Sequence, residues 1–137
     1  MRAIAQACTD VMFGKRLKEL RQQKQINTTD IAKELGIHQT SLSYFENREP
    51  ESIDLYLHFL AQRGIDLNEA FLSGAENIAK YLKKKRQESK IKWQEITQSI
   101  GINQSSLSYL ENREDTFFIN YLKLLVQKGV NLNDVFA

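Results

Sequence analysis

Two stretches of eleven residues combine side chains that could recognise the edges of nucleic-acid bases. They are QTSLSYFENRE, residues 39–49, and QSSLSYLENRE, residues 104–114. Plotted as helices at about 100° per residue, each places its apolar residues on one side and its amide, hydroxyl and phenol groups on the other. A glutamine can donate and accept hydrogen bonds to adenine at once. A solvated polar face is the alternative, but two copies in matching contexts favour base recognition.

The outward faces of these two predicted helices define the candidate base-reading residues. Surface helices usually carry lysine and glutamate on such a face, whereas here it holds only hydroxyls, amides and a phenol. The candidates are Gln39, Thr40, Ser43 and Tyr44 in the first stretch and Gln104, Ser105, Ser108 and Tyr109 in the second. The opposite faces, with Leu42 and Phe45 or with Leu107 and Leu110, should enter the core.

The two stretches belong to a longer internal repeat. A displacement of the sequence by 65 residues aligns residues 13–72 with 78–137 without a gap. Two copies are too few for a solenoid, so the pattern indicates a tandem duplication of one small domain. We therefore predict a first domain at residues 1–72, including an N-terminal extension at 1–12, and a second at 73–137. Each is near the lower size limit for folding alone, so contact between them should stabilise both.

Apolar periodicity and capping residues predict five helices in each repeat and no strand, hence an all-α fold. In the first repeat we expect helices near 10–25, 28–36, 39–49 and 53–63, and a short one after Asp66. In the second we expect them near 74–90, 93–100, 104–114 and 118–128, and after Asn131. Ser73 and Glu76 form an S-x-x-E pattern that predicts the start of the helix at 74–90. Gly36 and Gly101 each end the second helix of a repeat and create a helix-turn-helix arrangement.

Composition excludes several classes of protein. The 137 residues are 42% hydrophobic and 26% charged, which is typical of a soluble globular chain. No run approaches the roughly 18 apolar residues of a membrane helix, and no signal peptide is visible. The single cysteine, Cys8, fits a reducing compartment, so we predict a cytoplasmic protein with no membrane association.

The sequence offers little support for an enzyme. The two histidines, His38 and His58, lie in different predicted elements, and there is no glycine-rich phosphate loop, C-x-x-C pair or H-E-x-x-H motif. We therefore predict no catalytic residues, no metal, no cofactor and no small-molecule ligand.

Charge is distributed unevenly along the chain. The formal net charge is only +2, which alone would not indicate a nucleic-acid-binding protein. Residues 1–76 hold 9 Lys and Arg against 11 Asp and Glu, and residues 77–137 hold 10 against 6, giving −2 and +4. The second half should therefore attract phosphate more strongly.

A further set of residues recurs in both repeats in the same order. In the first repeat they are Arg21, Ile26, Ile31, Ala32, Leu35, Gly36, Ile37, Gln39, Leu42, Glu46 and Asn47. In the second they are Arg86, Ile91, Ile96, Thr97, Ile100, Gly101, Ile102, Gln104, Leu107, Glu111 and Asn112. On these residues each repeat resembles the DNA-binding domain of the lambda-type phage repressor and Cro family. The resemblance covers all but the first dozen residues and implies two tandem five-helix domains that bind DNA.

The resemblance also implies roles for matching positions. Arg21 with Glu46, and Arg86 with Glu111, should form partly buried ion pairs that tie the first helix of each repeat to the third. The base-reading positions of the family coincide with the candidates above. The implied phosphate contacts are Asn27, Thr28, Asn47, Arg48, Lys92, Trp93, Asn112 and Arg113.

The chain departs from the family pattern at two points. A glutamine that often binds phosphate at the start of the second helix is replaced by Thr28 and by Trp93. Arginine, at 48 and 113, follows the Glu-Asn pair where glycine is common, and the acidic Glu49 and Glu114 lie nearby.

The expected function is sequence-specific recognition of double-stranded DNA by a transcriptional regulator, a repressor, with the third helix of each repeat in the major groove. The alternative is a protein-binding adaptor or antitoxin-like partner in which one or both repeats serve as docking platforms. A second copy of the chain is a further partner left open. Two repeats arranged head to tail would suit a direct repeat in DNA, and two related by a two-fold axis would suit a palindrome.

Overall fold

The computed structural model describes residues 12–113 and 116–137, and this part of the chain is helical throughout, with no strand. The first five helices are α2 (Phe13–Gln23), α3 (Thr28–Leu35), α4 (Gln39–Asn47), α5 (Ser52–Gln62) and α6 (Leu67–Leu72). The next five are α7 (Ile78–Glu88), α8 (Trp93–Ile100), α9 (Gln104–Asn112), α10 (Phe117–Gln127) and α11 (Leu132–Phe136). None of these helices is long and apolar enough to cross a membrane. The all-α prediction is confirmed. Of the extension predicted at residues 1–12, all but Met12 lies outside the described residues.

Local sequence explains most helix ends. The side chain of Asn27 accepts a hydrogen bond from the backbone N–H of Asp30 and caps α3. Gly36 and Gly101 end α3 and α8 in the left-handed conformation, with φ values of 69° and 75°. Glycine adopts this conformation at little cost, so the chain can turn directly from α3 into α4 and from α8 into α9.

The predicted start of α7 is wrong by about four residues. Gly74 has φ 79°, which interrupts any helix there, and the hydroxyl of Ser73 donates instead to the carbonyl of Ala70. Asn77 caps α7 by accepting from the backbone N–H of Lys80, so the helix begins at Ile78.

A close helix contact positions α4. Gly14 in α2 is buried against the end of α4, and a Cβ added there would lie 2.4 Å from the carbonyl oxygen of Phe45. Only glycine therefore allows α2 and α4 to approach this closely. In the second repeat Ala79 occupies the aligned position, so α7 and α9 do not depend on the same glycine contact.

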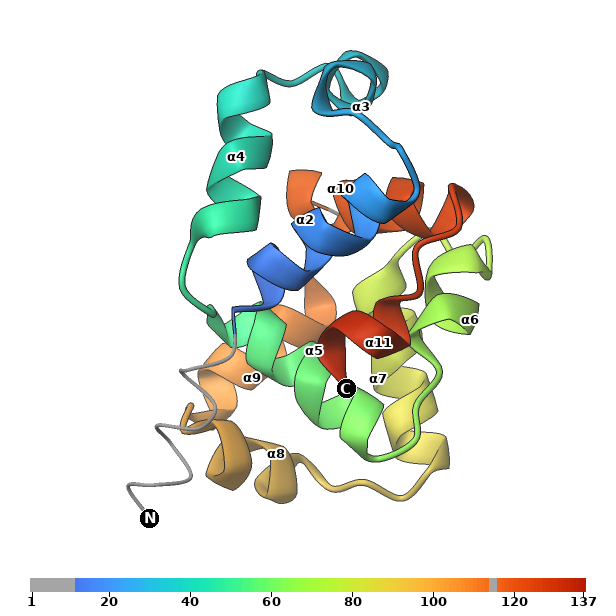
Figure 1. The fold of residues 1–137 in the computed structure, drawn as a ribbon. Coiled ribbons are helices and arrows are strands. Elements are labelled where there is room, and N and C mark those ends of the chain that lie inside the picture. Colours follow the sequence, from blue (N-terminus) through green and yellow to red (C-terminus); the bar gives the residue numbers. More distant parts are fainter. Residues whose placement is uncertain (1–11, 114–115) are drawn as a thin grey trace.

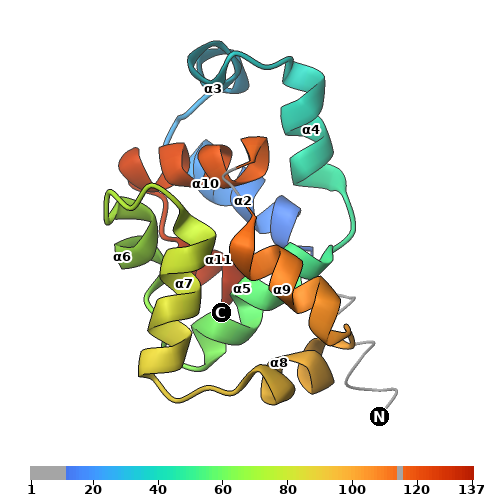
Figure 2. The same ribbon diagram turned by 180° about the vertical axis from the view of Figure 1, so that it is seen from behind.

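The two repeats exchange helices. Figures 1 and 2 show α3 and α4 at one end of the molecule and α8 and α9 at the other, with α5, α10 and α11 between them. Helix α5 of the first repeat packs against α8 of the second, and α10 of the second packs against α3 of the first. Helices α6 and α11 likewise pack on α7 and α2. The predicted domain boundary between residues 72 and 73 marks the end of one sequence repeat. Whether it also separates two domains stays a prediction, because helices on each side of it pack against helices on the other side.

The exchange is reciprocal at the start of the last helices. The backbone N–H of Leu132 donates to Oδ1 of Asn68 over 2.8 Å, and that of Leu67 donates to Oδ1 of Asn133 over 2.9 Å. Each bond becomes the other when 65 is added to or subtracted from its residue numbers. Contacts of this isologous kind are the signature of a two-fold axis, so the repeats are related by an approximate two-fold rotation.

The buried side chains of both repeats form one continuous core. Leu17, Leu42 and Leu57 of the first repeat and Leu122 and Leu125 of the second belong to one cluster, to which every described helix contributes buried residues. Exposed ion pairs follow the same exchange: Arg63, just after α5, lies 2.6 Å from Glu95 in α8, and Lys128, just after α10, lies 3.1 Å from Glu34 in α3. Because the core is shared, neither repeat buries its apolar face with its own helices alone.

Candidate nucleic-acid interface

The predicted base-reading residues lie on exposed faces of α4 and α9. All eight, Gln39, Thr40, Ser43, Tyr44, Gln104, Ser105, Ser108 and Tyr109, are solvent-exposed. The two tyrosines are the largest of them, with exposed fractions of 55% and 65%. The inward residues Leu42 and Leu107 are buried, which fixes the rotation of each helix about its axis. The two helices thus display neutral hydrogen-bonding groups to solvent.

A buried arginine anchors each of these helices. Nε and Nη2 of Arg21 donate to the two carboxylate oxygens of Glu46 over 2.7 and 3.1 Å, and Nη1 donates to the carbonyl of Ile26 over 2.7 Å. The arginine therefore ties α2, the α2–α3 connection and α4 together. Paired, hydrogen-bonded geometry of this kind offsets the cost of burying both charges.

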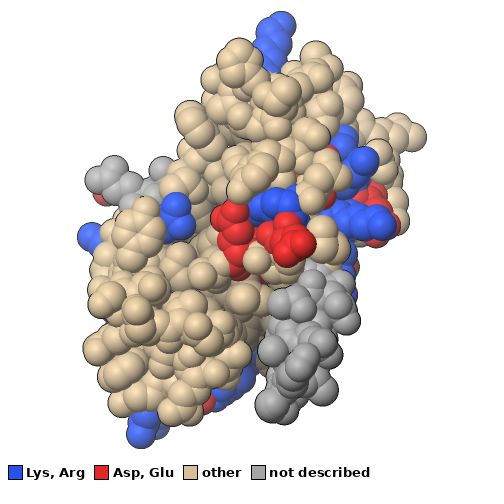
Figure 3. All heavy atoms as spheres, turned by 90° about the vertical axis from the view of Figure 1, so that its left-hand side faces the viewer, with Lys and Arg blue, Asp and Glu red and all other residues tan. Residues whose placement is uncertain are grey.

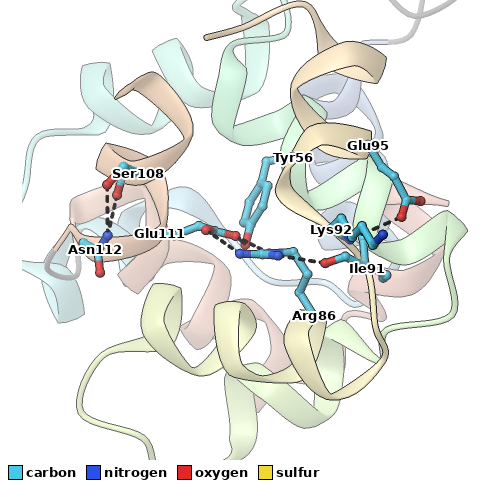
Figure 4. A network of polar contacts seen from close by, with 8 residues as sticks. All are labelled: Tyr56, Arg86, Ile91, Lys92, Glu95, Ser108, Glu111 and Asn112. Carbon is cyan, nitrogen blue, oxygen red and sulfur yellow. Dashed lines mark hydrogen bonds and ion pairs between the residues drawn. The ribbon is translucent and has the colours of Figure 1, made fainter. Parts of the chain in front are cut away.

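The second repeat reproduces this anchor, as Figure 4 shows. Arg86 donates to Glu111 over 2.7 and 2.9 Å and to the carbonyl of Ile91 over 2.8 Å. The aligned groups are the same and the distances nearly so, so α9 is held against α7 in the way that α4 is held against α2.

A tyrosine from the other repeat completes each anchor. The Tyr56 hydroxyl in α5 donates to Glu111 over 2.7 Å, and the Tyr121 hydroxyl in α10 donates to Glu46. Burial, reinforced by the adjacent carboxylate, raises the pKa of both phenols, so they remain protonated donors. Sequence reasoning missed these tyrosines because each partner lies in the opposite repeat. The sequence did hold one indication of their role: both repeats have a tyrosine at this aligned position, on a helix face that is otherwise apolar.

The two reading helices differ in how their side chains are engaged. In α4, Nε2 of Gln39 donates to Oγ1 of Thr29 over 2.7 Å, and the Tyr44 hydroxyl donates to Glu51 over 2.7 Å. In α9, no hydrogen bond from the side chain of Gln104 or Tyr109 occurs within the described part of the chain. Gln39 and Tyr44 of α4 therefore donate to groups within the protein, whereas Gln104 and Tyr109 of α9 keep their donors unengaged among the described residues.

The two arginines that follow the reading helices are also unlike. The side chain of Arg48 is only 8% exposed, and its Nη2 lies 3.2 and 3.3 Å from the oxygens of Asp54. Its guanidinium also stacks 4.2 Å from the ring centre of Phe118. Arg48 is thus occupied by contacts within the protein, unlike a guanidinium that is free to meet a phosphate. Arg113 instead lies over the ring of Tyr109 at 5.2 Å, and within the described ranges its Nε has no hydrogen-bond partner.

The remaining phosphate candidates lie at helix ends. Asn47 and Asn112 use the amide nitrogen to donate to the carbonyl of Ser43 and of Ser108 one turn earlier, each over 2.8 Å. The carboxylate of Glu95 accepts a hydrogen bond from the backbone N–H of Lys92 over 3.3 Å. The side-chain amine of Lys92 takes no part in this bond, and the residue is exposed. Trp93, at the first residue of α8, is 38% exposed. Asn27 is exposed and Thr28 is half-buried at the start of α3.

A hollow of about 390 Å³ brings base-reading and phosphate candidates of the first repeat together. Its lining comprises Lys18, Arg21, Thr28, Gln39, Thr40, Ser43, Glu46 and Asn47. Lys18 was missed by the sequence analysis, although it lies one turn before Arg21 on α2 and so on the same side of that helix. We add it to the phosphate candidates.

Figure 3 shows the side of the molecule that lies on the left in Figure 1, where α4 and α9 are found. Uncharged residues cover most of this side, and basic and acidic side chains gather next to each other near its middle. This side therefore carries no continuous basic surface among the described residues that it shows.

Comparison with known proteins identifies the first repeat. Residues 16–56 match the family model of the Cro/C1-type helix-turn-helix DNA-binding domain. The matched segment holds most of α2, all of α3 and α4, and the start of α5. No curated protein and no solved structure matches the chain. The resemblance predicted from the sequence is confirmed over this segment.

Proposed function

We propose that this chain, which carries a Cro/C1-type helix-turn-helix DNA-binding domain, is a transcriptional repressor that inserts α4 and α9 into the major groove of double-stranded DNA. The observation that carries the proposal is the repeated anchor of Arg21–Glu46 and Arg86–Glu111, which gives α9 the same support as α4. Both helices then present their neutral polar faces to solvent. A chain bound to a promoter through these two helices would block transcription. The expected compartment is the cytoplasm.

The approximate two-fold relation between the repeats favours a palindromic target. Dimeric members of this class place two recognition helices in successive major grooves about 34 Å apart. Here a single chain holds two such helices on a shared core. Inverted half-sites match a two-fold arrangement, whereas a direct repeat would need the two helices to point the same way along the DNA. We therefore favour an inverted repeat over the direct repeat and expect one chain to occupy it, without a homodimer.

The proposed contacts divide into two groups. Base edges would be read by Gln39, Thr40, Ser43 and Tyr44 and by Gln104, Ser105, Ser108 and Tyr109. Phosphates would be held by Lys18, Asn27, Thr28, Asn47, Lys92, Trp93, Asn112 and Arg113. Phosphate contacts set affinity and orientation, while base contacts set the preferred sequence.

The protein-binding adaptor receives less support from the same surfaces. A helix that docks in a partner groove needs exposed leucine, methionine or aromatic anchors at helical spacing. On the outward faces of α4 and α9 the exposed large hydrophobic residues are Tyr44 and Tyr109, one on each helix. A single anchor per helix does not form the stripe that such docking requires.

Glutamine substitutions test the reading role directly. We expect Gln39→Ala and Gln104→Ala each to weaken binding to the preferred duplex by about 1–3 kcal/mol and to relax selection in one half-site only. Fluorescence anisotropy with duplexes mutated in either half-site measures both effects. Gln62→Ala and Gln127→Ala are matched controls, because these exposed residues end α5 and α10 at aligned positions away from α4 and α9. Equal behaviour of all four variants would contradict the reading role.

A further inference from the structure

We propose that the two halves of the operator are read unequally, with α9 as the dominant reader and α4 restrained by hydrogen bonds that Glu51 and Thr29 make to its reading residues. This inference rests on the proposed function. It concerns how the binding energy divides between two similar helices, which the repeat alone would leave equal.

Glu51 engages two residues of the α4 end at once. One carboxylate oxygen accepts from the Tyr44 hydroxyl at 2.7 Å, and the other lies 3.3 Å from Nη1 of Arg48. The side chain is 46% exposed, so its negative charge also faces solvent beside α4. The bond to Glu51 raises the pKa of Tyr44. For Tyr44 to donate to a base, the protein must first break this hydrogen bond, and the carboxylate would then stand near the DNA.

The second repeat lacks this restraint. Thr116 occupies the position of Glu51, and Ile119 that of Asp54. The Thr116 hydroxyl accepts from the backbone N–H of Ile119 and caps α10, and in the described part of the chain it makes no bond to Tyr109. Tyr109 therefore keeps its hydroxyl for a base or phosphate. The Nε of Arg113 has no hydrogen-bond partner among the described residues, and Thr116 and Ile119 replace the two carboxylates that Arg48 meets.

Thr29 restrains the other main reader of α4. Its hydroxyl oxygen takes one amide N–H of Gln39, which fixes the direction of the amide and leaves one N–H and the carbonyl oxygen for a base. Gln94 stands at the aligned position in α8 and makes no such bond among the described residues. Gln104 can therefore turn to suit the base it meets, whereas Gln39 cannot.

Glu51 also borders a hollow of about 460 Å³ beside α9, together with Ser105 and Tyr109. Its hydrogen bond and its shortest ion pair nevertheless go to Tyr44 and Arg48. The restraint thus acts on α4, and the contribution of Glu51 at α9 is limited to its charge. The restraint by hydrogen bonding is therefore specific to α4, whereas the electrostatic effect of Glu51 acts beside both helices.

Reciprocal substitutions between the repeats test the inference. Glu51→Thr installs the residue of the second repeat and preserves a good helix cap, and Thr116→Glu installs the acid next to α9. The probes are a duplex enriched from a random pool and two versions with one half-site scrambled. Half-sites are assigned to helices with the Gln39→Ala and Gln104→Ala variants. Circular dichroism confirms that each variant is folded.

In the unaltered protein we expect scrambling of the α9 half-site to cost about fivefold more affinity than scrambling of the α4 half-site, which corresponds to about one neutral hydrogen bond. Glu51→Thr should tighten binding about threefold to tenfold where the α4 half-site is intact and by less where it is scrambled, and salt should weaken the gain. Thr116→Glu should weaken binding only where the α9 half-site is intact.

Glu49→Thr is the matched control, because it removes the same charge from an exposed residue that makes no hydrogen bond to a reading residue. Equal costs for the two half-sites, or equal gains from Glu51→Thr and Glu49→Thr, would overturn the inference while leaving DNA recognition intact. Equal binding of enriched and random duplexes by the unaltered protein would instead count against the proposed function itself.

Discussion

We expect residues 1–72 and 73–137, produced separately, to lack the fold that they adopt in one chain. Helix α5 follows α4 through an extended connection and packs against α8 and α11 of the other repeat, and its residues Tyr56, Leu57 and Leu60 are buried. Burial of each large apolar side chain is worth about 1.5–3 kcal/mol. The five buried apolar residues of α5 therefore account for roughly the whole stability of a small domain, about 5–15 kcal/mol. A lone fragment should be unfolded or should associate with a second copy of itself.

An equimolar mixture of the two fragments should recover the exchange. We expect a 1:1 complex with a cooperative thermal transition close to that of the intact chain, followed by circular dichroism and analytical ultracentrifugation. If each fragment alone is a folded monomer with its own cooperative transition at the temperature of the intact chain, the helix exchange does not contribute to folding.

We expect Arg21→Ala to destabilise the protein by about 3–5 kcal/mol, because it leaves the Glu46 carboxylate buried without its cation. The Glu46 side chain is only 3% exposed and also accepts from Tyr121 of the other repeat. The substitution should therefore weaken the contact between the two repeats as well as the packing within the first repeat. Chemical denaturation followed by circular dichroism measures the change, and Arg86→Ala should behave alike because the second anchor has the same form.

An exposed ion pair provides the control for this prediction. Arg63 and Glu95 also join two helices, but their side chains are 41% and 39% exposed. Arg63→Ala should therefore cost less than about 1 kcal/mol. Similar losses for Arg21→Ala and Arg63→Ala would show that the buried anchors do not support α4 and α9 as described.

The sequence was informative wherever local chemistry determines structure. Apolar spacing placed Leu42 and Leu107 in the core, and Gly36 and Gly101 marked the turns before the reading helices. The start of α7 was misplaced because Ser73 and Glu76 fit a capping pattern, while Gly74 prevents a helix there. Asn77 fits the N-cap position equally well, and it is the residue that caps α7.

The helix exchange could not be predicted from the sequence. Tyr56 and Tyr121 are aligned and identical, as are Leu57 with Leu122 and Leu60 with Leu125. Either copy of this helix therefore offers the same face to either repeat, and no local pattern distinguishes self-packing from exchange. The choice depends on the path of the connections between α4 and α5 and between α9 and α10.

The internal partners of the predicted site were equally hidden. Arg48 was expected at a phosphate because it follows the Glu-Asn pair, as Arg113 does. Its burial depends on Asp54 and Phe118, which come from two different helices of two different repeats. The difference between Glu51 and Thr116 was readable in the alignment of the repeats, but its meaning required the distance to Tyr44.

Selection of bound duplexes from a random pool, followed by sequencing, tests most directly the claim that one chain reads DNA with two helices related by a two-fold axis. We predict enrichment of two similar half-sites in inverted orientation, with centres about one helical turn, or 10–10.5 base pairs, apart. Half-sites in direct orientation, a single half-site, or no enrichment would contradict it.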